Sequence, residues 1–173
     1  MTRLSIVTAL LGLLLFSGMA QGENIDARLL GYNEVPSVAT VAHGEFRARI
    51  NRDDQSIDYD LTYDGLQGSV RQAHIHFAQP HVNGSIVIWL CGTASFPGPA
   101  GTQVCPQGGT INGTITSASV ITASTSSQQV DAGDLDKVIA AIRAGAAYVN
   151  VHTDPSPGGE IRGQIRASRR GRD

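Results

Sequence analysis

Two neighbouring segments of the chain alternate strictly between apolar and polar residues, and this period of two restricts the fold more than any other feature. The apolar positions are Phe46, Ala48 and Ile50 in residues 44–50, and Ile57, Tyr59, Leu61 and Tyr63 in residues 56–63. Polar turn formers occupy residues 51–54 between them. Because successive side chains of a β-strand point to opposite faces, the pattern predicts an antiparallel hairpin with one buried face.

The rest of the chain continues in short β-branched runs separated by turn signals, which is typical of a β-sandwich or barrel. We expect further strands at residues 26–32, 72–77, 85–91, 110–116, 119–122, 147–152 and 160–166. The run 85–91 is continuously apolar and predicts a central strand buried on both faces. Residues 134–145 instead carry one apolar helical stripe, with Asp134 as N-cap and Gly145 just beyond the end. The sequence therefore predicts an all-β domain with one short helix.

The first twenty residues have the three parts of a secretory signal peptide. Arg3 precedes an apolar stretch from Leu4 to Phe16, and Gly18 and Ala20 supply the small residues that signal peptidase needs. The apolar stretch is too short to cross a bilayer comfortably, and no comparable stretch follows. We therefore expect residues 1–20 to be a signal peptide cleaved near Ala20, no membrane span, and a secreted or periplasmic product.

The charge balance of the chain argues against a nucleic-acid partner. The sequence holds 13 basic and 15 acidic side chains, for a net charge of −2, and loss of Arg3 with the signal peptide makes the mature chain slightly more acidic. A nucleic-acid-binding protein would present a basic face. We expect residues 167–173, which are rich in arginine, to form a disordered basic tail.

The two cysteines, Cys91 and Cys105, predict an intramolecular disulfide. An even pair of cysteines in an exported protein is usually oxidised. The segment between them is rich in Gly, Pro and Thr and offers few side chains for a core. Two metal-binding thiolates are the less favoured alternative, because export and the lack of a C-x-x-C spacing both argue against it.

Three histidines are the residues most able to carry chemistry. Strand alternation puts His74 and His76 on one face, opposite Ile75, and puts His152 opposite its own apolar neighbour Val151. A His-x-His pair on a strand has Cα atoms about 6–7 Å apart, a spacing that can chelate one metal ion. If His152 came from a neighbouring strand, it would complete a three-ligand copper or zinc site with an open position.

A hydrogen-bonded polar network is the alternative interpretation of the same face. Asn150, Glu160, Arg162 and Gln164 could bond to one another and to the histidines, and such a network needs no metal. A nucleophile elbow, a phosphate loop and an H-E-x-x-H motif are all absent from the sequence, so it assigns no catalytic residues and leaves any enzymatic activity uncertain. Both interpretations of the histidines stay open.

Three segments together resemble the CHRD (chordin-like) domain family. They are LLGYNEVPSVATVAHG at 29–44, AHIHFAQPHVNGSIVIWLC at 73–91 and IRAGAAYVNVHTDPSPGGEIRGQI at 142–165. The resemblance covers residues 25–166 and implies an immunoglobulin-like, Greek-key antiparallel β-sandwich, in a stand-alone secreted member of bacterial type. It supplies no agreed activity. We expect a non-catalytic extracellular or periplasmic module that binds a protein or matrix partner, with a small copper- or zinc-binding metalloprotein as the alternative.

We predict that the exported form of this protein begins at or near Gln21. The small residues at Gly18 and Ala20 direct cleavage there, and the hydrophilic stretch that follows suits a new N-terminus. N-terminal sequencing of exported material measures the site. An exported form that retains Met1 would contradict the prediction.

Overall fold

The computed structural model describes residues 22–167, so the expected signal peptide lies outside the described residues. This part of the chain forms strands connected by loops and one α-helix. The elements are β1 (Glu23–Leu30), β2 (His43–Ile50), β3 (Ile57–Asp64), β4 (Val70–Phe77), β5 (Ser85–Cys91), β6 (Gly109–Ile115), α1 (Leu135–Arg143), β7 (Ala147–Thr153), β8 (Ile161–Gln164) and β9 (Arg166–Ala167). Within residues 22–167, no helix is long and apolar enough to cross a membrane.

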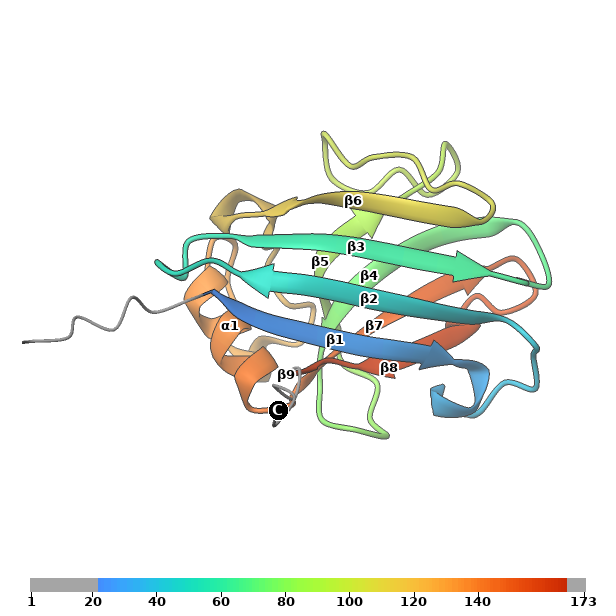
Figure 1. The fold of residues 1–173 in the computed structure, drawn as a ribbon, viewed down its shortest axis with the longest axis horizontal. Coiled ribbons are helices and arrows are strands. Elements are labelled where there is room, and N and C mark those ends of the chain that lie inside the picture. The colour runs from blue at the N-terminus through green and yellow to red at the C-terminus, as the bar shows by residue number, and fades with distance from the viewer. Residues whose placement is uncertain (1–21, 168–173) are drawn as a thin grey trace, which may run out of the picture.

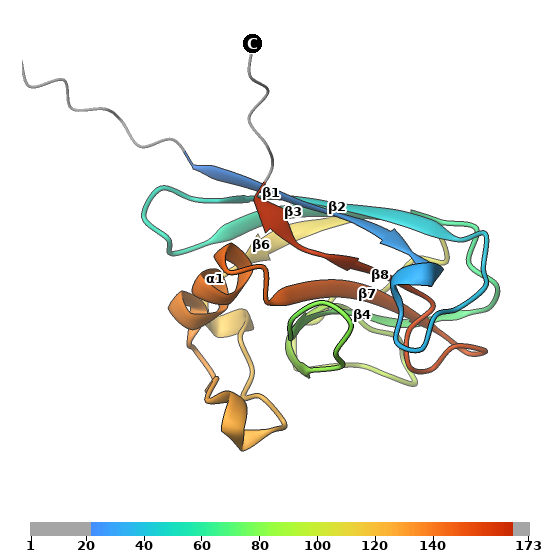
Figure 2. The ribbon, with the colours of Figure 1, turned by 90° about the horizontal axis from the view of Figure 1, so that it is seen from below.

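The strands belong to one continuous sheet that curls over itself into two layers. The order is β5-β4-β7-β8-β1-β2-β3-β6, with β9 paired to β1, and the strand pairings are antiparallel. Figure 2 shows β1, β2, β3 and β6 in one layer and β4, β7 and β8 in the other. The sheet turns the corner at the short contact between β8 and β1, where Leu30 pairs with Arg162. The all-β class with one short helix is confirmed.

The core lies between the two layers, where alternating side chains of both meet. The predicted hairpin is confirmed as β2 and β3: Phe46, Ile50 and Leu61 are buried in the core, while their polar neighbours are exposed. The opposite layer contributes Ile75 of β4 and Val149 of β7 among others. Burial of these apolar side chains is the main force that closes the sheet on itself.

The strand expected at residues 119–122 is wrong. The chain there makes a short 3-10 turn at Ser117–Ser119. The N–H of Thr116 donates to Oγ of Ser119, and the N–H of Ser119 donates back to the carbonyl of Thr116. This capping box turns the backbone away from β6. Val120 then makes an isolated bridge with Ile88 instead of a ladder.

Helix α1 lies at the end of the sandwich where β1 begins and β2 turns into β3 (Figure 1). Its apolar stripe, including Val138, Ile139 and Ile142, is buried as the sequence predicts. Gly145 ends the helix with a positive φ of 68° and donates its N–H to the carbonyl of Ile142.

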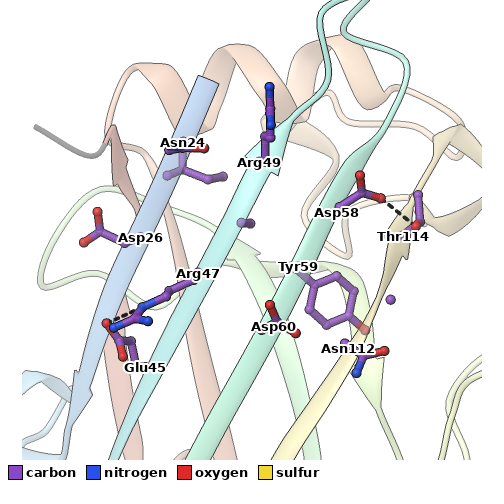
Figure 3. A pocket seen from close by; sticks show the side chains of 13 residues that line it. Asn24, Asp26, Glu45, Arg47, Arg49, Asp58, Tyr59, Asp60, Asn112 and Thr114 are labelled. Atoms are coloured by element: carbon purple, nitrogen blue, oxygen red, sulfur yellow. Dashed lines mark hydrogen bonds and ion pairs between the residues drawn. The ribbon is translucent and has the colours of Figure 1, made fainter. Parts of the chain in front are cut away.

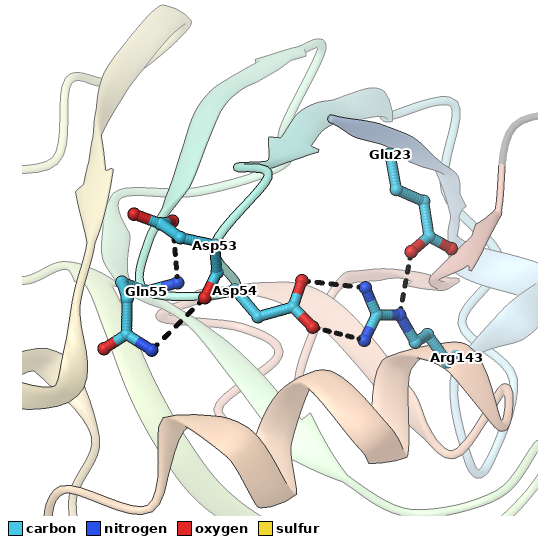
Figure 4. A network of polar contacts seen from close by, with 5 residues as sticks. All are labelled: Glu23, Asp53, Asp54, Gln55 and Arg143. Atoms are coloured by element: carbon cyan, nitrogen blue, oxygen red, sulfur yellow. Dashed lines mark hydrogen bonds and ion pairs between the residues drawn. The ribbon is translucent and has the colours of Figure 1, made fainter. Parts of the chain in front are cut away.

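An exposed ion-pair cluster ties the helix to the strands. Arg143 forms a bidentate ion pair with Asp54 in the β2–β3 turn, and its Nε donates a hydrogen bond to Glu23 of β1 (Figure 4). The two carboxylates raise the pKa of Arg143 above its ordinary range. The cluster fixes the helix against the sheet, although solvent screening keeps its contribution to stability small.

The first residue of the expected tail belongs to the fold. Ala167 pairs with Ile25 in β9, because β1 has a free backbone edge beyond its short contact with β8. A basic tail therefore begins no earlier than residue 168, and residues 168–173 lie outside the described residues.

The predicted disulfide between Cys91 and Cys105 is confirmed. The two cysteines are 14 residues apart in sequence, and their Cα atoms lie 5.0 Å apart. The bridge closes the loop that follows β5. Within this loop, the N–H of Gly92 donates to the carbonyl of Gln103, and the carbonyl of Gly92 accepts from the N–H of Cys105. The loop folds back onto β5, since a Cβ built at Gly98 would lie 2.6 Å from the ring of Trp89.

We predict that Cys91→Ala/Cys105→Ala lowers the free energy of unfolding by roughly 3 kcal/mol, because the unfolded chain regains the entropy of an open loop of this length. Urea denaturation of the oxidised wild type and the double variant measures the difference. Wild-type protein reduced by a thiol should lose a similar amount. Equal stability of the oxidised, reduced and double-variant proteins would contradict the prediction.

Candidate functional site

The pairing of β4 with β7 brings the three predicted histidines together. In this register Gln72 lies opposite His152, and His74 lies opposite Asn150. Ligand atoms of His74, His76 and His152, one from each ring, all lie within 4.8 Å of one another. Strand alternation alone could not show that these two strands are neighbours, so the convergence is a result of the fold.

The histidines are buried, although they lie on the face of β4 and β7 opposite the interlayer core. The exposed fraction is 0% for His74, 7% for His76 and 5% for His152. Loops and side chains cover this face: the ring of Trp89 lies 4.3 Å from that of His74, and the turn after β7 reaches His152 through Pro157. The sequence interpretation, which set the histidines apart from the core, gave no sign of this second buried layer.

Two of the rings have their tautomers fixed by backbone carbonyls. Nδ1 of His152 lies 3.0 Å from the carbonyl oxygen of Pro157, and Nδ1 of His76 lies 2.9 Å from that of Gly84. A carbonyl oxygen can only accept, so each Nδ1 carries the proton and each Nε2 has a free lone pair. An Nδ1–H bonded to a carbonyl is the arrangement that orients imidazole ligands in metal sites.

The free ring nitrogens have few partners. Nδ1 of His74 lies 3.2 Å from Nε2 of His152. Within residues 22–167, Nε2 of His74 and Nε2 of His76 are buried and have no hydrogen-bond partner. Leaving a buried polar atom unpaired costs about 1–3 kcal/mol, so such atoms in a folded protein are candidates for ligand binding.

Burial keeps the three imidazoles neutral at physiological pH. It lowers the pKa of His74 to about 2, helped by the neighbouring His152 and His76. It lowers the pKa of His76 to about 4 and that of His152 to about 4. In both cases a hydrogen bond to a backbone carbonyl raises the pKa and offsets only part of this effect. Neutral imidazole is the form that binds a metal ion.

The expected polar network is divided between separate places. Asn150 lies in the cluster, with Oδ1 at 3.0 Å from Nε2 of His152. Glu160 instead accepts hydrogen bonds from Thr40, Thr153 and the backbone of Gln67. Gln164 donates to the carbonyls of Ala78 and Gly145.

Arg162 also lies outside the rings. Its guanidinium donates to Asn83 and to the carbonyl of Val82, and its central carbon lies 3.3 Å from the ring centroid of Tyr148. Tyr148 in turn stacks on His76, with centroids 4.6 Å apart and an interplanar angle of 4°. The guanidinium of Arg162 therefore contacts an aromatic ring rather than the histidine nitrogens.

Glu34 is a site residue that sequence reasoning missed. Its side chain is buried, and Oε1 has no hydrogen-bond partner in the described chain. Burial raises its pKa to about 7, although Arg162 and Asn150 act in the opposite direction. The available signal was its place in the segment LLGYNEVPSVATVAHG, where a lone carboxylate interrupts apolar and small residues.

A larger hollow lies elsewhere on the described part of the chain. It has a volume of about 830 Å³ and runs over the outer face of β1, β2, β3 and β6 (Figure 3). Several of its charged groups have local partners: Asp58 accepts from Thr114, and Arg47 pairs with Glu45. This is a solvated polar face, so the histidine cluster is the better candidate site.

The fold and the cluster together define an all-β domain with a buried three-imidazole centre. The CHRD domain family model matches residues 25–165, which is most of the chain, and the protein belongs to the CHRD domain family. No curated protein and no solved structure matches the chain.

We predict that the protein loses stability steeply on acidification from pH 6.5 to pH 4.5. The unfolded chain takes up protons at His74, His76 and His152 in this window, whereas the folded chain does so only at lower pH. Glu34, with its raised pKa, holds a proton in the folded state that it lacks in the unfolded state. This one proton offsets part of the three that the unfolded chain binds at the histidines. The free energy of unfolding should fall by as much as about 3 kcal/mol per pH unit.

Urea denaturation of metal-free protein at pH 7, 6 and 5 measures this slope. His76→Gln removes one of the three groups and should flatten the profile by about 1.4 kcal/mol per pH unit. A pH-independent free energy of unfolding over this window would show that the histidines are not held neutral by the fold.

Proposed function

We propose that this chain is an exported CHRD domain that binds one copper or zinc ion between His74, His76 and His152. The observation that carries the proposal is that one ligand nitrogen from each of three neutral, buried imidazoles lies within 4.8 Å of the others, and that Nε2 of His76 has no hydrogen-bond partner among the described residues. Export rests on the signal-peptide pattern of residues 1–20, and the disulfide is consistent with an oxidising compartment.

The spacing of the ligand atoms suits a tetrahedral ion. Two ligands at 2.0–2.1 Å from zinc with a tetrahedral angle lie about 3.3 Å apart, and Nδ1 of His74 lies 3.2 Å from Nε2 of His152. His76 needs only a small rotation of its ring to join them, since no ligand atom is more than 4.8 Å from another. Three protein ligands leave the fourth position for water or an exogenous group.

The cluster has more hydrogen-bond acceptors than donors, which favours a cation over a self-sufficient polar network. Because Nδ1–H of His152 donates to the carbonyl of Pro157, Nε2 of His152 is an acceptor. Nδ1–H of His74 can donate to this Nε2 at 3.2 Å, but the same Nε2 also faces a second acceptor, Oδ1 of Asn150, at 3.0 Å. Two acceptors repel unless a proton or a cation lies between them. A metal ion bound to Nε2 of His152 would also engage the unpartnered nitrogen of His76, and imidazole suits copper and zinc alike.

The family supports a binding role for the domain and gives no evidence of catalysis. Binding to an extracellular protein or matrix partner stays a prediction from the sequence. The histidine cluster, in contrast, offers converging donor atoms whose chemistry suits a metal ion. We therefore place metal binding first.

We predict that untagged mature protein, stripped of metal and then loaded, binds one copper or zinc ion per chain. The single tryptophan, Trp89, contacts His74 and provides a reporter, because bound Cu²⁺ should quench its fluorescence. His76→Gln keeps a donor for the carbonyl of Gly84 but removes a ligand, so the affinity should fall by more than about 100-fold, beyond the usual effect of an outer-shell change.

His43→Ala is the matched control, because His43 is exposed at the start of β2 and outside the cluster. Its metal content should equal that of the wild type. Elemental analysis and fluorescence titration measure stoichiometry and affinity, and thermal unfolding shows that each variant is folded. A folded wild type that takes up neither metal, or a folded His76→Gln that binds both as tightly as the wild type, would overturn the proposal.

A further inference from the structure

A second, smaller hollow lies where β1, β8 and β9 meet the loop between β4 and β5. Its volume is about 320 Å³, and its lining includes three arginines, Arg28, Arg162 and Arg166, together with His81. The one carboxylate in the lining is Asp26. This residue already takes part in a further interaction. The hollow is therefore rich in positive charge in a chain whose net charge is negative.

Two of these guanidinium groups are available to a ligand. The side chains of Arg28 and Arg166 are exposed, and among the described residues no hydrogen bond or ion pair engages either guanidinium. Arg47 and Arg143, in contrast, pair with carboxylates on the surface. Arg166 of β9 pairs with Asp26 of β1, two residues from Arg28, so the two arginines share one face of this strand pair.

The third guanidinium is buried and has no ion-pair partner among the described residues. Arg162 is 2% exposed, and its hydrogen bonds go to the neutral oxygens of Asn83 and Val82. No carboxylate of residues 22–167 forms an ion pair with it within 4.0 Å. Glu34 exerts some attraction, but its raised pKa leaves it only partly ionised at neutral pH. A buried cation with incomplete compensation is costly, and an anion beside it would offset that cost.

We propose that this hollow binds a tetrahedral oxyanion, either free sulfate or phosphate or the same group as an ester on a sugar. Guanidinium groups donate in a planar fork that matches the oxygens of such anions. A volume of about 320 Å³ exceeds what a single oxyanion fills and leaves room for part of a sugar ring. This site is separate from the metal centre, because the ring of Tyr148 contacts both Arg162 and His76 and lies between the two.

Isothermal titration of the mature protein with sodium sulfate, sodium phosphate and a sulfated disaccharide, at constant ionic strength, tests the proposal. Arg28→Gln/Arg166→Gln should weaken binding at least tenfold, because two charged donors are lost. Both side chains are exposed, so the fold should be kept, and thermal unfolding verifies it. Arg47→Gln is the control, since it removes an arginine charge from an exposed strand position outside the hollow, although one charge rather than two.

Each result decides one point. Saturable binding of the inorganic ions that is lost in the double variant and kept in Arg47→Gln supports a free-oxyanion site. Binding confined to the disaccharide, with the same dependence on the variants, supports a sulfated sugar. Absence of saturable binding for all three probes, or an equal loss in Arg47→Gln, overturns the proposal. Copper or zinc stoichiometry should be unchanged in the double variant, so failure here and failure of the metal centre are distinguishable.

Discussion

The antiparallel pairing of β4 with β7 is the constraint on which both the core and the candidate site depend. Its register fixes two faces at once. Toward the other layer it presents Ile75 and Val149, which are fully buried in the apolar core. On the reverse face the same ladder sets the two histidines of β4 beside His152 of β7. A slip of one residue would exchange the two faces, so the hydrophobic effect that selects the register also assembles the imidazoles.

The reverse face needs its own cover, because neutral imidazoles at these positions require exclusion of water. Backbone carbonyls of Gly84 and Pro157, from two different loops, accept hydrogen bonds from Nδ1–H of His76 and His152. The β4–β5 loop is held down in turn by Arg162, which bonds Asn83 and Val82. The loops are therefore part of the site: they bury the rings, fix their tautomers and leave Nε2 directed inward.

Much of the fold was predictable from the sequence because the strands carry their own periodicity. The β2–β3 hairpin and helix α1 each present one apolar face, and both form as predicted. The strand expected at 119–122 failed because local bonds between Thr116 and Ser119 compete with the ladder. For the site, alternation within β4 gives the face of each histidine, but no local pattern encodes which strands are neighbours or which loops bury them. Glu34 was missed for the same reason, since its surroundings come from segments far away in sequence.

The remaining question is how a cation site tolerates a buried guanidinium nearby. The aromatic ring of Tyr148 lies against both Arg162 and His76, so the two positive centres would be separated by an apolar body rather than by contact. Glu34 supplies negative charge in the same neighbourhood: Arg162 stabilises its ionised form while burial opposes ionisation. An anion held beside Arg162 would lower the local positive potential further, which is favourable for a dication in a site that lacks carboxylate ligands. The two proposed sites would then bind ligands of opposite charge on either side of one tyrosine, and their electrostatic effects on each other would be favourable.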